Sequence, residues 1–264
     1  MIDQSSTVLP EFRGASTEFP GPSGWPPSLV LSIFPGIGLL DRAFEEEGFC
    51  VVRGPDIIWG GDVHAFRPPA GRFDGVIGGP PCQSFSKLGV MARNRGQAVG
   101  KNLIPEFERV VVEAAPVWFV MENVKEAPLP NVPGYEVRDV LVENRTDCGG
   151  VQRRKRRFSF GTRDGRALEI HWWKPPLPTE CVPTITANGS VWDPVKQQSR
   201  GQNDRKYLAL AIRAQGLPDD YLENAPFTVE AKIKAVGNGV PLPMGRTIAR
   251  AVRAACEAND KAQR

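Results

Sequence analysis

Short apolar runs, each followed by a turn and a helical pattern, constrain the fold of this chain more than any other feature. The first run, LVLSIF at residues 29–34, leads through the turn PGIG into the helical pattern LLDRAFEEEG, which ends at Gly48. Strand and helix signals then return in FCVVRG, FDGVI, NLIPEFERVVVEA and VWFVMEN. Continuous apolar strands that alternate with helices are typical of a parallel sheet covered on both faces. We therefore expect an α/β fold whose mostly parallel sheet has helices on both faces.

The pattern changes after RFSFGTR at residues 157–163. Residues 165–205 are rich in proline, tryptophan and polar side chains and have little helical period, which predicts a small irregular module. Order returns in YLALAIRAQG and TVEAKIKAV, and a last helix is indicated by the apolar stripe Met244, Ile248, Val252 and Ala255. The expected units are an N-terminal extension, draped on the surface or partly disordered (1–28), a main domain (29–164), the small module (165–226) and C-terminal helices that return to the main domain (227–264).

The composition is that of a chain able to bury a sizeable core, because 41% of its 264 residues are hydrophobic and 24% are charged. No apolar run approaches the roughly 20 residues of a membrane span, and we expect neither a span nor a signal peptide. The five cysteines lie far apart, which favours reduced thiols in a cytosol-like compartment over a disulfide framework. With only two histidines, a dedicated zinc site is not expected.

Positive charge is concentrated in two segments, although the net charge is only +3. QRRKRR at residues 152–157 holds five cations in a row, and Arg93, Arg95 and Lys101 form a second basic stretch. Such runs are either solvated surface or a contact face for a polyanion, because each phosphate contact releases counterions and favours binding.

Glycines and carboxylates follow the first two expected strands, at the edge where an open parallel sheet binds ligands. Gly36 and Gly38 in FPGIG allow the backbone to approach a cofactor closely, or they form a plain turn. Asp56 follows the second strand and Asp62 stands in GGDV. A carboxylate in such a place typically hydrogen-bonds ribose hydroxyls; the alternative is a turn or capping residue.

The sequence GGPPCQSFS at residues 78–86 places a cysteine directly behind two prolines, at the tip of the FDGVI strand. Pro80 and Pro81 cannot donate a ladder hydrogen bond, so the strand must end and the chain must turn. Cys82 is therefore either a small buried apolar residue or a nucleophile on a stiff loop. Glu122, which ends the apolar run VWFVMEN, is either a solvent-facing strand end or a partly desolvated group suited to sharing a proton.

Read in order, FPGIGLLDRAF, GGPPCQSFS, MENV, QRRKRRFSFGTR, RAQGLPDDY and AVGNGVP resemble the motifs of the DNA cytosine-5 methyltransferases. The resemblance covers residues from about Leu29 to Val252, with a gap across the proline-rich module. It implies a Rossmann-like fold that depends on S-adenosylmethionine, with the catalytic and cofactor-binding domain at 29–164 and a short target-recognition module at 165–226.

The resemblance also implies the roles of individual residues. Cys82 would add to C6 of a cytosine flipped out of the duplex while Glu122 neutralises N3, and the methyl group would come from S-adenosylmethionine, leaving S-adenosylhomocysteine. The implied catalytic residues are Cys82, Glu122, Asn123 (which steadies the loop), Arg154 (which shapes the site) and Arg156 (which contacts the pyrimidine carbonyl). The implied cofactor-binding residues are Phe34, Gly36, Gly38, Asp56 (ribose), Asp62 (adenine amino group), Val63, Pro81, Leu103, Asn238 and Val240. The implied DNA-binding residues are Gln83, Ser84, Ser86, Arg93, Arg95, Gln152, Thr186 and Arg200.

Three positions depart from the family pattern. Ser32 stands where the family usually has an aspartate, Pro35 replaces a small residue, and Gly239 replaces the usual serine. Asp56 and Asp62 also lie close together in the sequence, whereas family members normally have a helix between the two motifs.

We expect a monomeric, cytoplasmic enzyme of prokaryotic or phage origin, of the restriction–modification type. It would act on double-stranded DNA, use no metal and not bind membranes; whether it has a cognate restriction nuclease is left open. Two alternatives are a related methyltransferase that acts on RNA and a catalytically silent DNA-binding relative. The presence of Cys82, Glu122 and Arg156 together speaks against the silent relative, since drift in a non-enzyme would not be expected to spare all three.

Overall fold

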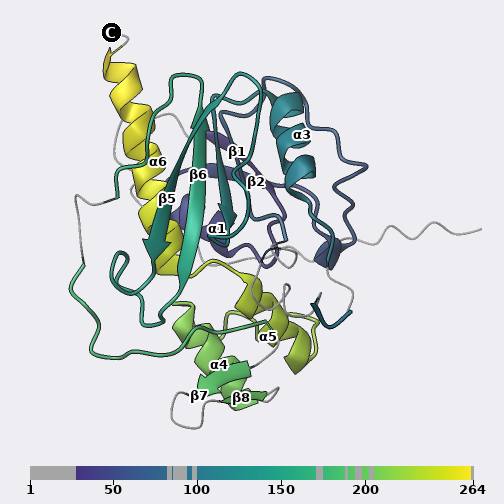
Figure 1. Ribbon diagram of the computed structural model, residues 1–264, viewed down its shortest axis with the longest axis vertical. Coiled ribbons are helices and arrows are strands. Elements are labelled where there is room, and N and C mark those ends of the chain that lie inside the picture. Colours follow the sequence, from purple (N-terminus) through teal and green to yellow (C-terminus); the bar gives the residue numbers. More distant parts are fainter. Residues whose placement is uncertain are drawn as a thin grey trace, which may run out of the picture.

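A six-stranded sheet forms the centre of the protein (Figure 1). The computed structural model describes residues 28–81, 85, 94–96, 100–170, 175–187, 190–193, 198–201 and 205–262. Within them the strand order is β2-β1-β3-β4-β6-β5. The strands are β1 (Leu29–Ile33), β2 (Cys50–Arg53), β3 (Gly75–Gly78), β4 (Trp118–Asn123), β5 (Glu136–Glu143) and β6 (Lys155–Thr162).

The direction of the strands decides where the loops lie. Strands β2, β1, β3 and β4 pair in parallel, whereas β6 is antiparallel to both β4 and β5. The mostly parallel sheet expected from the apolar runs is therefore confirmed. Strand β5 was not expected, and it lies at the sheet edge with a mainly exposed or half-buried surface.

Helices cover both faces of the sheet, as the sequence predicted. Neighbouring residues of β4 point to opposite faces, so Trp118 joins one hydrophobic core and Phe119 joins the other. The first core contains residues of α1 (Leu39–Glu46) and α6 (Leu242–Ala262), and the second contains residues of α3 (Ile104–Ala114). The sheet is thus the middle layer between α1 and α6 on one side and α3 on the other (Figure 1).

A third hydrophobic core lies beneath the sheet in the view of Figure 1. It joins α4 (Arg205–Ala214) and α5 (Val229–Asn238) to Val182 and Ile185, and it reaches α1 through Leu39 and Ala43. The irregular segment expected between 165 and 205 also contains a hairpin of β7 (Ser190–Asp193) and β8 (Gln198–Gly201). Because α4 and α5 share this core, the packed unit extends across the boundary predicted at residue 226.

Apart from Ser28, the N-terminal extension expected at 1–28 lies outside the described residues. In the part of the chain that the structure describes, no helix has both the length and the apolar character needed to cross a bilayer.

Candidate active site

The loops singled out in the sequence meet at one edge of the sheet. The four parallel strands β1 to β4 end there, so the segments 54–62, 34–38, 79–81 and 122–124 follow each other along this edge. Strand β6 runs antiparallel to β4 and pairs Asn123 with Arg157, so it begins where β4 ends. The start of β6 therefore brings Arg156 to the same edge.

Glu122 and Asn123 form the best-defined part of this edge. Glu122 is only 9% exposed, and one oxygen of its carboxylate lies 2.7 Å from Nε of Arg156. Asn123 is buried; its Nδ2 donates a hydrogen bond to the carbonyl oxygen of Pro80 at 3.2 Å, and its Oδ1 accepts one from the amide of Val124 at 2.9 Å. The side chains that end β4 thus bind both the start of β6 and the loop that follows β3.

Cys82 lies outside the described residues, but residues 79–81, which directly precede it, are described and lie close to Glu122 and Asn123. A Cβ atom added to Gly79 would lie 3.0 Å from Oε2 of Glu122, so the backbone passes directly against this carboxylate. Pro80 is held by Asn123, and Pro81 is exposed. The described residues 79–81 therefore leave the sheet beside Glu122.

The basic run 152–157 is not a uniform charged surface. Arg153 and Lys155 are exposed, whereas Arg154 is buried and donates to the carbonyl oxygens of Ile185 at 2.9 Å and Gly237 at 3.1 Å. Arg154 thereby ties the start of β6 to the segment before the β7–β8 hairpin and to α5. Arg154 therefore connects the sheet with the third hydrophobic core inside the protein.

Gln152 is fully buried, and its amide bonds within the protein. Its Nε2 donates to Ala214 O and to Gln215 Oε1, both at 2.9 Å, and its Oε1 accepts from the amide of Ile185 at 3.2 Å. In this structure the side chain reaches no surface that a DNA backbone could contact, so its expected place among the DNA contacts has no geometric support.

The turn after β1 has three residues with positive φ, at Phe34, Gly36 and Gly38. Phe34 has a φ of 58°, a left-handed conformation that is strained for a bulky residue, and strain of this kind concentrates at ligand sites. Gly36 has a φ of 57°, and a Cβ atom placed there would meet nothing within 4 Å. Gly38 caps α1 with a φ of 77° and lies against the Arg53 guanidinium, which is 2.8 Å from a Cβ atom placed there. The side of Gly36 on which a Cβ atom would stand is thus open space, while its amide and carbonyl groups are already bonded, to Asp56 and to Trp59.

Asp56 joins the loops after β1 and β2. Its carboxylate accepts hydrogen bonds from the amides of Gly36 at 2.8 Å and Ile58 at 2.9 Å, and it caps the short 3-10 helix η1 (Ile57–Trp59). This single turn occupies the place where the family normally has a longer helix. Ile57 is 88% exposed, so an apolar side chain stands in solvent next to the Asp56 carboxylate.

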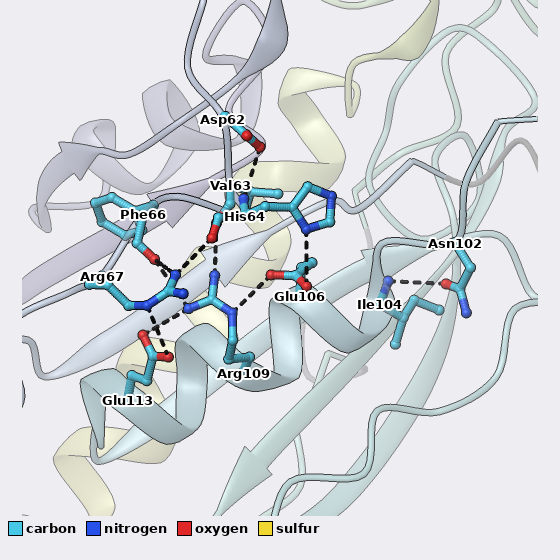
Figure 2. A network of polar contacts seen from close by, with 10 residues as sticks. All are labelled: Asp62, Val63, His64, Phe66, Arg67, Asn102, Ile104, Glu106, Arg109 and Glu113. Carbon is cyan, nitrogen blue, oxygen red and sulfur yellow. Dashed lines mark hydrogen bonds and ion pairs between the residues drawn. The ribbon is translucent and has the colours of Figure 1, made fainter.

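Asp62 begins a turn that is attached to α3. Its Oδ1 accepts from the amide of His64 at 2.9 Å, and the next residue, Val63, is buried. Figure 2 shows this turn above α3, with Arg109 bonded to the main chain of Val63 and Phe66. The turn thus carries Asp62 on a backbone that a neighbouring helix fixes.

The remaining cofactor candidates lie in two places. Leu103 precedes the first turn of α3 and packs against the core that contains Ile104. Val240 is buried just after α5, in the core beneath α1 and α6, whereas Asn238 at the end of α5 is exposed.

Among the candidate DNA contacts, Gln83, Ser84, Ser86 and Arg93 lie outside the described residues. Arg95 is exposed, and the half-buried Thr186 meets the hydroxyl group of Tyr207 through its backbone. Arg200 belongs to β8.

Three further side chains form hydrogen bonds at this edge and were not among the residues predicted from the sequence. Asp41 on α1 is fully buried and hydrogen-bonds the Ser32 hydroxyl at 2.5 Å, so a carboxylate from the helix stands beside the strand position that lacks the usual aspartate. Trp59 Nε1 donates to Gly36 O at 2.8 Å, and the Tyr221 hydroxyl donates to Ile37 O at 2.9 Å. The only sequence signal was the aspartate inside the apolar pattern LLDRAF.

Within the described ranges, no group of three or more histidine, cysteine, aspartate or glutamate side chains is arranged to hold a metal ion.

Comparison with known proteins identifies the relatives of this chain. Residues 61–210 match the sequence model of a family described as C-5 cytosine-specific DNA methylase. The Type II methyltransferase M.NgoPII of Neisseria gonorrhoeae is 30% identical over 204 residues, which cover 65% of this chain and 58% of the relative. The Type II methyltransferase M.FnuDI of Fusobacterium nucleatum is 30% identical over 193 residues, 62% of this chain and 55% of the relative. This chain therefore spans less than two thirds of the length of these relatives.

Solved structures agree on the fold. Entamoeba histolytica methyltransferase EhMeth superposes with a TM-score of 0.57 at 11% identity, covering 87% of this chain and 99% of that one. A variant of Spodoptera frugiperda DNMT2 superposes with a TM-score of 0.59 at 12% identity, covering 86% and 99%. At these identities the likeness establishes the methyltransferase fold.

Proposed function

Because the chain belongs to the C-5 cytosine-specific DNA methylase family, we propose that it methylates cytosine at C5 in duplex DNA with S-adenosylmethionine as the donor. The observation that carries the proposal is the contact of Glu122 with Arg156 at the root of the Cys82 loop, where Asn123 binds Pro80. Addition to a cytosine ring requires a nucleophile, an acid and a cation, and we assign these roles to Cys82, Glu122 and Arg156.

The proposed chemistry begins with a cytosine that leaves the base stack, since its C6 cannot be reached inside a duplex. The Cys82 thiolate forms a bond to C6, and electrons move toward N3, where Glu122 supplies a proton. Arg156, fixed against Glu122, stabilises the charge that develops on the pyrimidine carbonyl. After C5 has gained the methyl group, a water molecule accepts the C5 proton, the C5–C6 double bond forms again and the bond between C6 and sulfur breaks, its electrons leaving on the thiolate. N3 then returns its proton to the Glu122 carboxylate.

S-adenosylmethionine, when bound, supplies an electrophilic methyl group. The residues at the ends of β1 and β2 fit such a molecule, since Gly36 leaves open space where other residues carry a side chain, and the exposed Ile57 directly follows Asp56 in the sequence. We assign the turn after β1 to the methionine part, Asp56 to the ribose and Asp62 to the adenine amino group. Each carboxylate oxygen of Asp56 accepts one hydrogen bond from a main-chain amide. The remaining lone pairs would accept hydrogen bonds from the ribose hydroxyl groups.

Residues 165–226 are proposed to read the target sequence, because they depart in composition from the main domain and pack beside the sheet edge through α4. We propose further that the protein acts as a monomer in the cytoplasm, with a role in restriction and modification.

Methyl transfer from tritiated S-adenosylmethionine tests the proposal directly. Duplex DNA should accept label, and bisulfite sequencing of the product should place 5-methylcytosine in one short sequence. A covalent complex with duplex DNA that contains 5-fluorocytosine should form with the wild-type chain and be absent in Cys82→Ser. Label in transfer RNA and none in DNA would identify an RNA methyltransferase instead, and DNA binding without label or adduct would identify a silent binder.

A further inference from the structure

Arg109 on α3 is the centre of a polar network that spans two segments of the chain (Figure 2). Its Nε lies 2.8 Å from Glu106 Oε2, and its Nη1 lies 2.8 Å from Glu113 Oε2. Nη1 also donates to the carbonyl oxygen of Phe66 at 3.1 Å, and Nη2 donates to that of Val63 at 2.7 Å. One guanidinium therefore binds two carboxylates of its own helix and two carbonyl groups of the turn that starts at Asp62.

The two carboxylates fix the guanidinium before it meets the turn. Glu106 and Glu113 lie one turn of helix on either side of Arg109, at spacings of three and four residues that bring their side chains together. The hydrogen bond from Arg109 is the largest influence that lowers the pKa of Glu106, so this partner stays ionised well below neutral pH. The Arg109 side chain is only 24% exposed, which limits competition from water for its donors.

The turn has only short-range bonds of its own. Residues 62–67 form no strand or helix; the amides of Ala65 and Phe66 donate to the carbonyl oxygens of Asp62 and Val63, both at 3.2 Å, and Asp62 Oδ1 accepts from the amide of His64. His64 makes a second connection to the helix, with Nδ1 at 3.1 Å from Glu106. Arg67 is different, since its two short hydrogen bonds go to carbonyl groups of the same turn, at His64 and Phe66. Its ion pair with Glu113 of α3 is long, at 3.8 Å, compared with 2.8 Å for that of Arg109.

We propose that Arg109 is a positioning residue for cofactor binding, which locks the turn 62–67 onto α3 so that the Asp62 carboxylate is held ready for the adenine amino group. The inference rests on the proposed function, in which Asp62 recognises the cofactor. A preformed turn avoids the cost of ordering the loop when the ligand arrives, so Arg109 raises affinity without touching the ligand. A lysine cannot replace it, because a single ammonium group does not present a planar fork to four acceptors.

The test compares Arg109→Met and Arg109→Lys with the matched control Arg67→Met in the full chain. Calorimetric titration with S-adenosylmethionine should show at least tenfold weaker binding for both Arg109 variants and a change below twofold for the control. KM for the cofactor should rise in parallel, while kcat at saturating cofactor and the affinity for duplex DNA stay within threefold of wild type. Unchanged cofactor affinity would overturn the inference, and so would an equal loss of cofactor binding, DNA binding and kcat, which indicates general loss of structure.

A double-mutant cycle with Asp62→Asn shows whether Arg109 acts through Asp62. Because the two residues would serve one interaction, Arg109→Met should weaken cofactor binding less than threefold in the Asp62→Asn background. A second tenfold loss in that background would overturn the inference. Should Arg109→Met fail to fold, Glu106→Gln removes one anchor of the guanidinium and the contact to His64, and it should weaken cofactor binding about threefold or more; unchanged binding would again overturn it.

The outcome for wild type separates the two proposals. A wild-type chain that binds no S-adenosylmethionine overturns the proposed function together with this inference. A wild-type chain that binds it and methylates DNA, with Arg109→Met equally competent, overturns this inference alone.

Discussion

The Glu122 carboxylate and the Arg156 guanidinium lie 2.7 Å apart, although they come from strands that run in opposite directions. The contact is possible because β6 begins at the edge where β4 ends. Both side chains are largely buried, with 11% and 17% of the side chain exposed, so the pair is shielded from bulk water. An ion pair so placed holds the carboxylate and the guanidinium in fixed positions relative to each other at the edge where the parallel strands end.

Glu122→Gln is expected to lower kcat by about 10²-fold or more, because the amide keeps the size of the side chain but has no carboxyl proton to give to N3. Affinities for DNA and for S-adenosylmethionine should stay within about threefold of wild type, since the packing at the end of β4 is preserved. Single-turnover methyl transfer measures the rate. The exposed Glu126 offers the matched control Glu126→Gln, which should transfer methyl groups at the wild-type rate. A Glu122→Gln variant with a rate near wild type would contradict the proposed role.

Ser32 and Asp41 are expected to behave as one unit. Burial raises the pKa of Asp41, against the effect of the hydrogen bond from Ser32 and the charge of Arg53. Ser32→Asp would place a second carboxylate beside the buried first one and should destabilise the protein by about 3 kcal/mol or more. The exchanged variant Ser32→Asp with Asp41→Ser restores one carboxylate and one hydroxyl and should recover at least half of that loss.

Urea denaturation of the wild type, both single variants and the exchanged variant gives the coupling free energy between the two positions. An exchanged variant that loses as much free energy of unfolding as the two single variants lose together would show that the helix carboxylate does not replace a strand carboxylate.

The sequence predicted the sheet because its inner strands are buried on both faces. Runs such as LVLSI and WFVMEN are mostly apolar, and glycine or proline stands at or just after the ends of β1, β2 and β3. Strand β5 escaped prediction because EVRDVLVE is largely exposed at the sheet edge and is held by pairing with β6. Its formation depends on a partner strand, which a local pattern does not reveal.

Charge was harder to interpret than hydrophobicity. The run QRRKRR looked like one surface, yet Arg154 is buried and bonds to the carbonyls of Ile185 and Gly237. Those acceptors come from distant parts of the chain, so no local pattern could separate Arg154 from its exposed neighbours Arg153 and Lys155. The family resemblance named Glu122 and Arg156 as residues of one site, but their contact follows from the antiparallel pairing of β4 with β6, which the sequence did not predict.

Gly237→Ala is expected to push α5 away from the neighbouring segment at Thr186 and Ala187, next to the third hydrophobic core. A Cβ atom at this position would lie 2.6 Å from the backbone at Thr186 and Ala187, which a side-chain rotation cannot relieve. Overpacking of this kind should lower the free energy of unfolding by about 1–3 kcal/mol. Urea denaturation measures the loss, with Lys234→Ala on the exposed side of the same helix as the control. Stability equal to wild type would show that the contact between α5 and the segment 186–187 yields easily.

The buried thiol of Cys148 is expected to make the protein lose stability at alkaline pH. Burial raises its pKa from 9.0 to about 12, so between these values the unfolded chain releases a proton that the folded chain keeps. A raised pKa in the folded state contributes stability that is complete below pH 9 and is lost as the pH rises toward 12. Relative to Cys148→Ala, wild type should therefore lose about 1.4 kcal/mol for each pH unit above 9. Urea denaturation of both proteins at pH 8.0, 9.5 and 10.5 measures the difference, and a difference that does not vary with pH would show that the thiol is not shielded in solution.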